Sequence, residues 1–479
     1  MTSLGPAGVD AVHALVGDLA GTRPPLYAAL AARLRLLIGD GRLPIGARLP
    51  AERELAAALH VSRATVAAAY GRLREQGWAD ARQGAGTWTR LPAGPSQGAW
   101  LPAPARPGVI DFAHAAPAAP PQVPAAFAAA LDELPRLLPG HGYHPQGLPE
   151  LRARIADRYT ARGVPTTPEQ VLVTAGALHA VSVAVETLVD RGGRVLVEHP
   201  TYPNALDAVR SLGRRAVPVA ATAGEPDALV RDLSRAARQT SPGAAYLMPD
   251  FQNPTGLLLD EPLRRRLAVG LRQAGVMAIV DETLADLGID AEPPPPFAAI
   301  ARPEAVVTVG SMSKSVWGGL RVGWLRAEED VVRRLAAVAG HTHMSGPVLE
   351  QLAACQLLDA ADEVLTARRD DLRRQRDVLV AELGRHLPGW EVPVPSGGLV
   401  LWCRLPSLSS TALVSAAESR GLLLAPGPRF GTGHAFDDRL RLPYTQPVDV
   451  ITRGVQLLAD AVADLPTARH VAVAEQIVV

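Results

Sequence analysis

The chain has 479 residues, which is too long for one small core and predicts two or three domains. Its composition, 48% hydrophobic and 20% charged, is typical of a soluble globular protein. The first residues lack a signal-peptide pattern, no apolar stretch is long enough for a bilayer, and Cys355 and Cys403 lack metal-ligand spacing. These features argue against a secreted or membrane-spanning protein, and we expect a cytoplasmic protein without a metal site.

The net charge is zero overall but unevenly spread. Residues 23–90 hold 11 arginines against 5 acidic residues. A compact basic end on a neutral chain is typical of a nucleic-acid-binding module. A solvated helical surface is the alternative explanation, so the predicted elements have to decide.

The first ninety residues predict three helices and a hairpin. Amphipathic spacing indicates a helix over 26–40, a second over 51–60, and a third over 62–77 with Ser62 as its N-cap. The stretch "WADARQGAGTWTR" predicts a two-stranded hairpin with a glycine-rich tip. This order is that of a winged helix-turn-helix, whose third helix would enter the major groove of DNA.

The stretch "GRLPIGARLPAERELAAALHVSRATVAAAYGRLREQGW" resembles the DNA-binding domain of GntR-type bacterial regulators. The resemblance implies double-stranded DNA as a partner. Two alternatives stay open: Ser62 as a helix cap only, and Arg53 in a surface ion pair. The residues implied to contact DNA are Arg53, Ser62, Arg63 and Thr65, with Gln83 and Gly84 at the wing.

Proline, glycine and alanine dominate residues 91–109, which predicts a semi-rigid linker between a head over 1–90 and a second domain over 110–479. In the second domain, strand-like segments such as "VLVTAG", "RVLVEH" and "MAIVDE" alternate with helical ones. The alternation predicts an α/β domain with a largely parallel sheet. Ligands in such domains bind at the carboxyl ends of the strands.

Lys314, in "GSMSKSVWGGLRVGW", is the only lysine in a chain with 48 basic residues. Arginine can replace lysine as a positive charge but cannot act as an amine nucleophile, so the retained lysine indicates Schiff-base chemistry. Asp281, Asn253 and Tyr202 follow other predicted strands. A lysine, a carboxylate, an amide and an aromatic ring are the groups that a pyridoxal 5′-phosphate site needs.

The order and spacing of these residues resemble fold-type I aminotransferases, which are pyridoxal-phosphate-dependent transferases, over residues 110 to about 465. By this resemblance Lys314 forms the Schiff base with the cofactor, Asp281 pairs with the pyridine nitrogen, and Asn253 contacts the phenolic oxygen. It also implies ring stacking by Tyr202 and binding of a substrate or effector carboxylate by Arg441, for which a structural ion pair is the alternative. The residues implied to hold the phosphate are Ala175, Gly176, Ala177, Ser311, Ser313 and Arg321, with Tyr143 reaching it from a neighbouring subunit.

Two departures from the aminotransferase pattern put efficient transamination in doubt. Leu284 lies where these enzymes usually carry a tyrosine that bonds the phenolic oxygen. His114 to Ala116 occupy a stretch where the family often has a glycine that touches the substrate carboxylate. Cofactor binding should survive both changes.

A GntR-type head joined to an aminotransferase-like domain resembles the MocR group of bacterial regulators. This implies a transcriptional regulator that senses pyridoxal phosphate or an amine or amino acid effector. It also implies a head-to-tail homodimer on paired DNA half-sites. The alternatives are an active aminotransferase with an accessory head, and a DNA-binding protein whose second domain no longer binds the cofactor.

Overall fold

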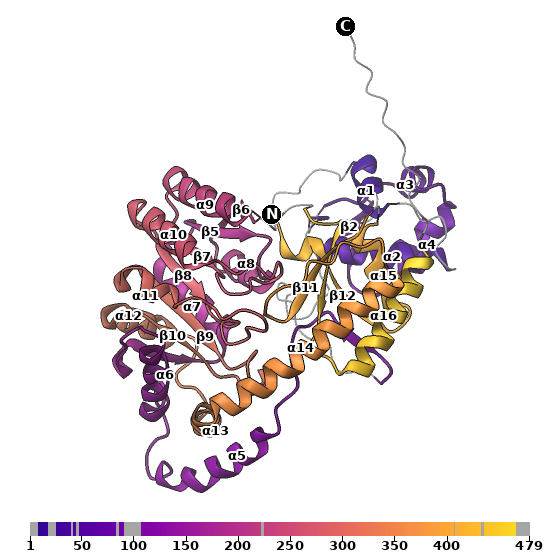
Figure 1. The fold of residues 1–479 in the computed structure, drawn as a ribbon. Helices are drawn as coiled ribbons and strands as arrows, with labels where there is room; N and C mark the ends of the chain where they lie inside the picture. Colours follow the sequence, from indigo (N-terminus) through magenta and orange to yellow (C-terminus); the bar gives the residue numbers. More distant parts are fainter. Residues whose placement is uncertain are drawn as a thin grey trace.

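The computed structural model describes residues 8–17, 25–39, 42–44, 47–82, 86–90, 107–221, 225–406, 408–432 and 435–465. The described chain forms three units, each with its own sheet (Figure 1). We call them the head (residues 8–90), the central unit (113–360), and the C-terminal unit (361–465 together with strand β3). Most of the predicted linker, up to residue 106, lies outside the described residues.

The head is built from helices that pack around a small apolar core, followed by an antiparallel hairpin. Leu34, Val66 and Leu73 are buried in this core. The helices and hairpin predicted from residue 26 onward are confirmed, whereas helix α1 was not predicted. The elements are α1 Val9–Val16, α2 Leu26–Gly39, α3 Glu52–Ala58, α4 Arg63–Glu75, β1 Ala79–Arg82 and β2 Gly86–Thr89.

The central unit contains a seven-stranded sheet in the order β4-β10-β9-β8-β7-β5-β6. Only β10 runs antiparallel to its neighbours within it, so the prediction of a largely parallel sheet is confirmed. Strands such as β4, β7 and β9 are buried throughout, which explains their nearly continuous apolar sequence, whereas β6 at the edge of the sheet is partly exposed. They are β4 Val171–Thr174, β5 Arg194–His199, β6 Arg215–Ala220, β7 Ala244–Leu247, β8 Met277–Asp281, β9 Val306–Ser311 and β10 Gly323–Arg326.

Helices cover both faces of this sheet, and an apolar core lies on each face. Helices α6, α9, α10 and α13 pack on one face, and α7, α8 and α12 on the other. None of the described helices is long and apolar enough to cross a lipid bilayer. The helices of this unit are α5 Gln122–Glu133, α6 Pro149–Ala161, α7 Ala177–Leu188, α8 Pro203–Ser211, α9 Pro226–Thr240, α10 Glu261–Gln273, α11 Phe297–Ile300, α12 Glu329–Ala339 and α13 Val348–Asp359.

The C-terminal unit is a four-stranded sheet in the order β11-β13-β12-β3, which was not predicted. Strand β3 comes from a segment more than 300 residues away and pairs with β12 in parallel. Helix α14 runs from the central unit to this one (Figure 1). Its elements are β3 Ile110–Phe112, α14 Ala361–His386, β11 Val400–Arg404, α15 Ser410–Glu418, β12 Leu422–Pro426, the 3-10 turn η5 Gly427–Phe430, β13 Arg439–Pro443 and α16 Val448–Ala463.

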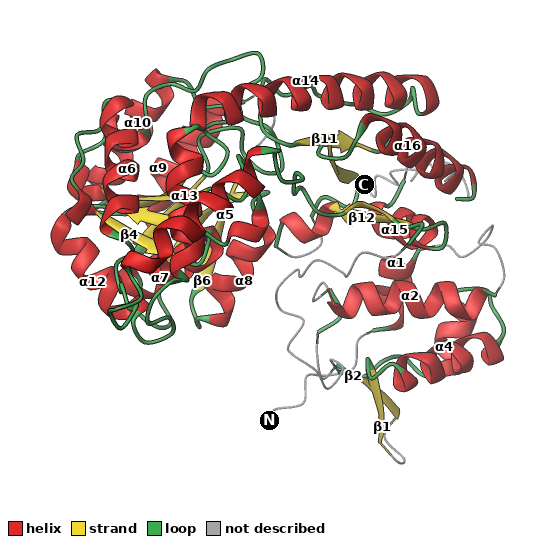
Figure 2. Cartoon of the chain, turned by 90° about the horizontal axis from the view of Figure 1, so that it is seen from below, coloured by secondary structure: helices red, strands yellow, loops and turns green. Residues whose placement is uncertain are grey.

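The head lies beside the C-terminal unit, away from the central unit (Figure 2). Helix α2 contacts α15, and Arg35 forms an ion pair with Glu418 at 2.9 Å. Buried Arg42 donates to Oγ1 of Thr411 at 2.7 Å. The head is thereby held against the C-terminal unit of the same chain.

Candidate functional site

Polar side chains gather at the carboxyl ends of the central strands. Asp281 and Ser311 are the last residues of β8 and β9, and Lys314 follows Ser311 by three positions. The charges of Asp281, Arg321 and Arg441 all influence the pKa of Lys314, so these groups face a shared space. The predicted cofactor residues of the strand ends therefore lie together at the edge where α/β folds bind ligands.

The amine of Lys314 lies inside this space. Its Nζ donates to the backbone carbonyl of Ala115 at 2.7 Å. Burial, followed by the positive charge of Arg441, lowers the pKa of Lys314 to about 8, although Asp281 acts in the opposite direction. The neutral, nucleophilic fraction of the amine near neutral pH is therefore much larger than for an ordinary lysine.

Asp281 is a buried carboxylate, with 3% of its surface exposed. Oδ2 accepts from the hydroxyl of Tyr246 at 2.7 Å, and Oδ1 accepts from the backbone N–H of Thr283 at 3.0 Å. Burial raises the pKa of Asp281, and these donors and the charge of Lys314 oppose the increase. Tyr246 was not predicted from the sequence.

Asn253 and Tyr202 lie on loops that follow β7 and β5. The Oδ1 atom of Asn253 is buried and has no hydrogen-bond partner among the described residues. Tyr202 is partly buried, and its pKa is raised to about 12 by burial and by the charge of Asp281. Its ring and the amide of Asn253 are thus neutral groups available to a ligand.

The predicted phosphate-binding residues form a second cluster, at the start of α7. The Oγ of Ser311 donates to the Oγ of Ser313 at 2.9 Å, and Arg321 donates to the carbonyl of Ala175 at 2.6 Å. The backbone N–H of Ala175 donates to Nδ1 of His179 at 3.2 Å, a contact that was not predicted. In this structure that N–H is engaged by the protein itself, and Gly176 and Ala177 provide the remaining amides of the turn.

Arg441 lies on β13 and is buried, with 6% of its surface exposed. It donates to the carbonyl of Ala113, and its guanidinium lies 5.0 Å from the ring centroid of Phe430. Burial lowers the pKa of Arg441 to about 10, against the charges of Tyr202 and Asp111. No carboxylate pairs with Arg441 in the described structure, so the alternative of a structural ion pair receives no support.

Two further predicted positions lie outside this space. Tyr143 has 55% of its surface exposed, and its ring stacks on His141. Leu284 is buried in the apolar core. Its side chain has no hydrogen-bonding group, so it cannot play the role of the tyrosine expected from the resemblance.

The predicted DNA-binding residues of α4 lie at its exposed N-terminus. The Oγ of Ser62 accepts from the backbone N–H of Thr65 at 3.0 Å, which confirms Ser62 as a helix cap. Exposed Arg63 forms an ion pair with Glu52 at 3.2 Å. Arg53 is exposed on α3. The two wing residues Gln83 and Gly84 lie outside the described residues.

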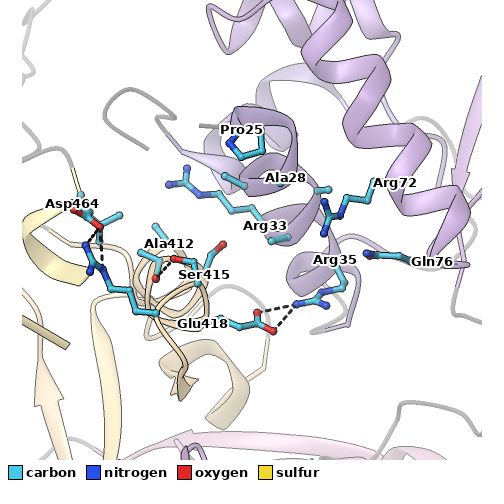
Figure 3. A pocket seen from close by; sticks show the side chains of 17 residues that line it. Pro25, Ala28, Arg33, Arg35, Arg72, Gln76, Ala412, Ser415, Glu418 and Asp464 are labelled. Atoms are coloured by element: carbon cyan, nitrogen blue, oxygen red, sulfur yellow. Dashed lines mark hydrogen bonds and ion pairs between the residues drawn. The ribbon is translucent and has the colours of Figure 1, made fainter. Parts of the chain in front are cut away.

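A cavity of about 470 Å³ separates part of the head from the C-terminal unit (Figure 3). Arg35 and Glu418 close one side of it, and Arg420 pairs with Asp464 on another. Alanines of α2 and α15 leave the space open. The contact between the two units is therefore polar and incompletely packed.

The residues present fit pyridoxal 5′-phosphate. Lys314 offers an amine of lowered pKa, and Asn253 offers an amide whose N–H groups can donate to a phenolic oxygen. Gly176 has φ +94°, and a Cβ there would lie 2.8 Å from Nη2 of Arg321. Only glycine leaves the turn open where a phosphate would lie between the start of α7 and Arg321.

Comparison with family models divides the chain into two parts. Residues 113–456 match class I and II aminotransferases, and residues 26–88 match bacterial regulatory proteins of the gntR family. The aminotransferase-like part of the chain is similar to the solved structure of LysN. LysN is an α-aminoadipate aminotransferase from Thermus thermophilus, solved in complex with N-(5′-phosphopyridoxyl)-L-leucine. Its TM-score is 0.69 at 29% identity, covering 74% of this chain and 92% of that one.

Similar proteins carry names of two kinds. The chain is 31% identical to 2-aminoadipate transaminase of Thermus thermophilus over 376 residues, covering 75% of this chain and 91% of that protein. It is 28% identical over 448 residues to the HTH-type pyridoxine biosynthesis transcriptional regulator PdxR of Corynebacterium glutamicum, covering 89% and 96%. It is also 28% identical to the probable rhizopine catabolism regulatory protein MocR of Rhizobium meliloti, covering 84% and 86%.

Proposed function

The chain belongs to the class I and II aminotransferase family and carries a gntR-type DNA-binding domain ahead of it, and we therefore propose that it is a transcriptional regulator of the MocR type. The observation that carries this proposal is the presence in one chain of two separate sites. The N-terminus of α4 is exposed on the head, and an amine-bearing cofactor site lies in the central unit. We assign the head to residues 1–90, the linker to 91–109 and the second domain to 110–479.

The cofactor is pyridoxal 5′-phosphate, which supplies an aldehyde that reacts with amines and a ring that withdraws electrons. We propose that Lys314 holds it covalently through Nζ, that Asp281 faces its ring nitrogen, and that Asn253 faces its phenolic oxygen. Tyr202 would cover the ring of the cofactor. The phosphate of the cofactor would be held by Ser311, Ser313, Arg321 and the turn of Ala175, Gly176 and Ala177.

The effector would be the cofactor itself or an amine or amino acid. Arg441 favours a carboxylate-bearing effector, because a guanidinium binds a carboxylate with two parallel hydrogen bonds. Such a ligand would replace the carbonyl of Ala113 on Arg441. Since Ala113 directly follows β3, this exchange would alter the end of the strand that leads back toward the head.

DNA would be read by the head, with Ser62, Arg63 and Thr65 at the base edges and Arg53 on the backbone. Gln83 and Gly84 would contact DNA at the wing. We propose a head-to-tail homodimer that binds paired half-sites, in which exposed Tyr143 reaches the partner's phosphate site. A cytoplasmic location accords with this role.

An active aminotransferase is the second candidate. The retained Lys314 and Asp281, together with the similarity to 2-aminoadipate transaminase, favour it. The apolar side chain of Leu284 argues against it, because leucine lacks the hydroxyl by which a tyrosine at this position would bond the phenolic oxygen of the cofactor. Slow exchange of amino groups would be compatible with a sensor, whereas fast multiple turnover would favour the enzyme.

Binding to the DNA upstream of the protein's own gene tests the proposal. We expect tight binding at a fixed salt concentration of about 0.15 M, and much weaker binding to a shuffled fragment of equal length. Arg63→Ala should weaken selective binding about tenfold or more, since it removes a group placed at the base edges. Arg302→Ala, an exposed arginine on the central unit, is the matched control. Equal binding to both fragments, here and at neighbouring promoters, would favour the enzyme.

A further inference from the structure

The hydroxyl of Tyr246 donates to Oδ2 of the buried carboxylate of Asp281, and the side chain of Thr283 also bonds this carboxylate. It lies on β7, where it pairs with Ile279 of β8, two residues before Asp281. Because side chains alternate along a strand, residues 279 and 281 project from the same face of the sheet as Tyr246. The register of the two strands therefore brings the phenol to the carboxylate.

The contact lies deep inside the protein. Tyr246 has 1% and Asp281 has 3% of its surface exposed. Oδ2 accepts from the hydroxyl of Tyr246 at 2.7 Å, and Oδ1 accepts from the backbone N–H of Thr283 at 3.0 Å. Tyr246 belongs to the sheet and Thr283 to the turn that directly follows β8, so these donors fix the carboxylate plane while a lone pair remains for a further donor.

The protonation states of the surrounding groups agree with this direction of donation. Burial and the neighbouring carboxylate raise the pKa of Tyr246 well above its ordinary value, so the phenol stays a donor. Glu198, on β5, is another buried carboxyl whose pKa is influenced by Asp281, and burial raises its pKa to about 7. Lys314 contributes the opposing positive charge. Hydrogen bonds to a buried carboxylate favour its ionised form.

We propose that Tyr246 is a positioning residue for the cofactor: it holds Asp281 ionised and oriented toward the ring nitrogen of pyridoxal 5′-phosphate. The inference rests on the proposed placement of that ring against Asp281. An ionised Asp281 keeps the ring nitrogen protonated, which strengthens the electron withdrawal on which the cofactor's chemistry depends. Tyr246 would act on the cofactor only through Asp281.

Tyr246→Phe tests this role, because it removes the hydroxyl and keeps the ring that fills the core. We expect the dissociation constant of the cofactor to rise about tenfold or more, since a hydrogen bond to a buried charge is lost. We also expect the absorption spectrum of the bound cofactor at fixed pH to change, because its bands report the protonation of the ring. Tyr159→Phe is the matched control, since it removes another buried hydroxyl of the central unit, which accepts from Nε1 of Trp324 and lies away from Asp281 in the hydrogen bonds of the described residues.

Asp281→Asn separates the inference from the proposal on which it rests. If Asp281→Asn alters cofactor affinity and spectrum but Tyr246→Phe alters neither, the role of Tyr246 is wrong while the placement of the ring stands. If Asp281→Asn alters neither, the placement itself is wrong. Tyr246→Phe could instead lower only the melting temperature, as Tyr159→Phe is expected to do, and leave the spectrum unchanged. The hydroxyl of Tyr246 would then be purely structural, and the inference would be overturned.

Discussion

The pKa of Lys314 is lowered to about 8 because the side chain is withdrawn from water and lies near Arg441. Only the neutral amine attacks an aldehyde. We expect the rate of cofactor attachment to the cofactor-free protein to rise with pH, to reach half its maximum near pH 8, and then to level off. Stopped-flow absorbance measures this rate, and Lys314→Arg is the control that should show no attachment.

A half-maximum near the ordinary lysine pKa of 10.5 would contradict this account of Lys314.

The lowered pKa of Lys314 also affects the stability of the protein. Between about pH 8 and 10.5 the unfolded chain carries the proton that the folded chain has lost. Because the unfolded state then binds more protons, this group makes the cofactor-free protein more stable as the pH rises through that window.

Residues that carry reactive groups could be predicted from the sequence, whereas their supporting residues could not. Lys314, Asp281 and Asn253 follow strand-like segments, so their place at the edge of the sheet follows from the alternation of elements. Tyr246 lies inside an apolar strand, and its contact depends on the register of β7 against β8. His179 lies on the first turn of α7 and bonds a backbone amide, which no spacing rule indicates.

Helix α4 depends on its cap. The Oγ of Ser62 accepts from the backbone N–H of Thr65, so Ser62→Ala should lower the free energy of unfolding of the head by about 1 kcal/mol. Ser62→Asp should retain that stability, since aspartate caps helices equally well. Ser62→Ala should bind the operator more weakly because it lacks the hydroxyl proposed to contact DNA, and Ser62→Asp because its negative charge would repel DNA phosphates.

Thermal unfolding and DNA titration of the two Ser62 variants separate the cap from the DNA contact. If Ser62→Asp binds DNA as tightly as the unchanged protein, Ser62 is a cap and no more.

At the scale of elements, the sequence predicted the helices and the hairpin of the head from residue 26 onward. It did not predict α1. It also did not predict the sheet of the C-terminal unit, because β3 pairs with a strand more than 300 residues later in the chain.

Three hydrogen bonds, linked by short backbone segments, run from the head to the proposed cofactor site. Arg42 donates to Thr411 at the start of α15, and the neighbouring Ser410 accepts from the backbone of Gly427 at 3.1 Å. The carbonyl of Phe430, in the same turn η5, accepts from Thr201 at 2.8 Å. Thr201 precedes Tyr202, which we propose covers the cofactor ring. No local sequence pattern could predict the bond between Arg42 and Thr411, because these residues are 369 positions apart in the chain.

Arg42→Ala should loosen the head from the C-terminal unit, since it removes the buried bond to Thr411 and the ion pair with Asp437 at 3.7 Å. We expect faster hydrogen exchange of backbone amides in α2 and α15, because these helices lose protection when the contact opens. Mass spectrometry of peptides measures the exchange. Arg48→Ala, an exposed position elsewhere on the head, is the control. Unchanged exchange in Arg42→Ala would show that this contact does not hold the head.

The measurement that tests the central claim most directly is the affinity for the DNA upstream of the protein's own gene, at fixed salt, with and without pyridoxal 5′-phosphate. If the cofactor is a signal, its addition should change the affinity about fivefold or more, and the change should vanish in Lys314→Ala. Selective binding that ignores the cofactor would point to an amine or amino acid as the effector. A cofactor-dependent change that persists in Lys314→Ala would contradict the account, because the signal would then bypass the site.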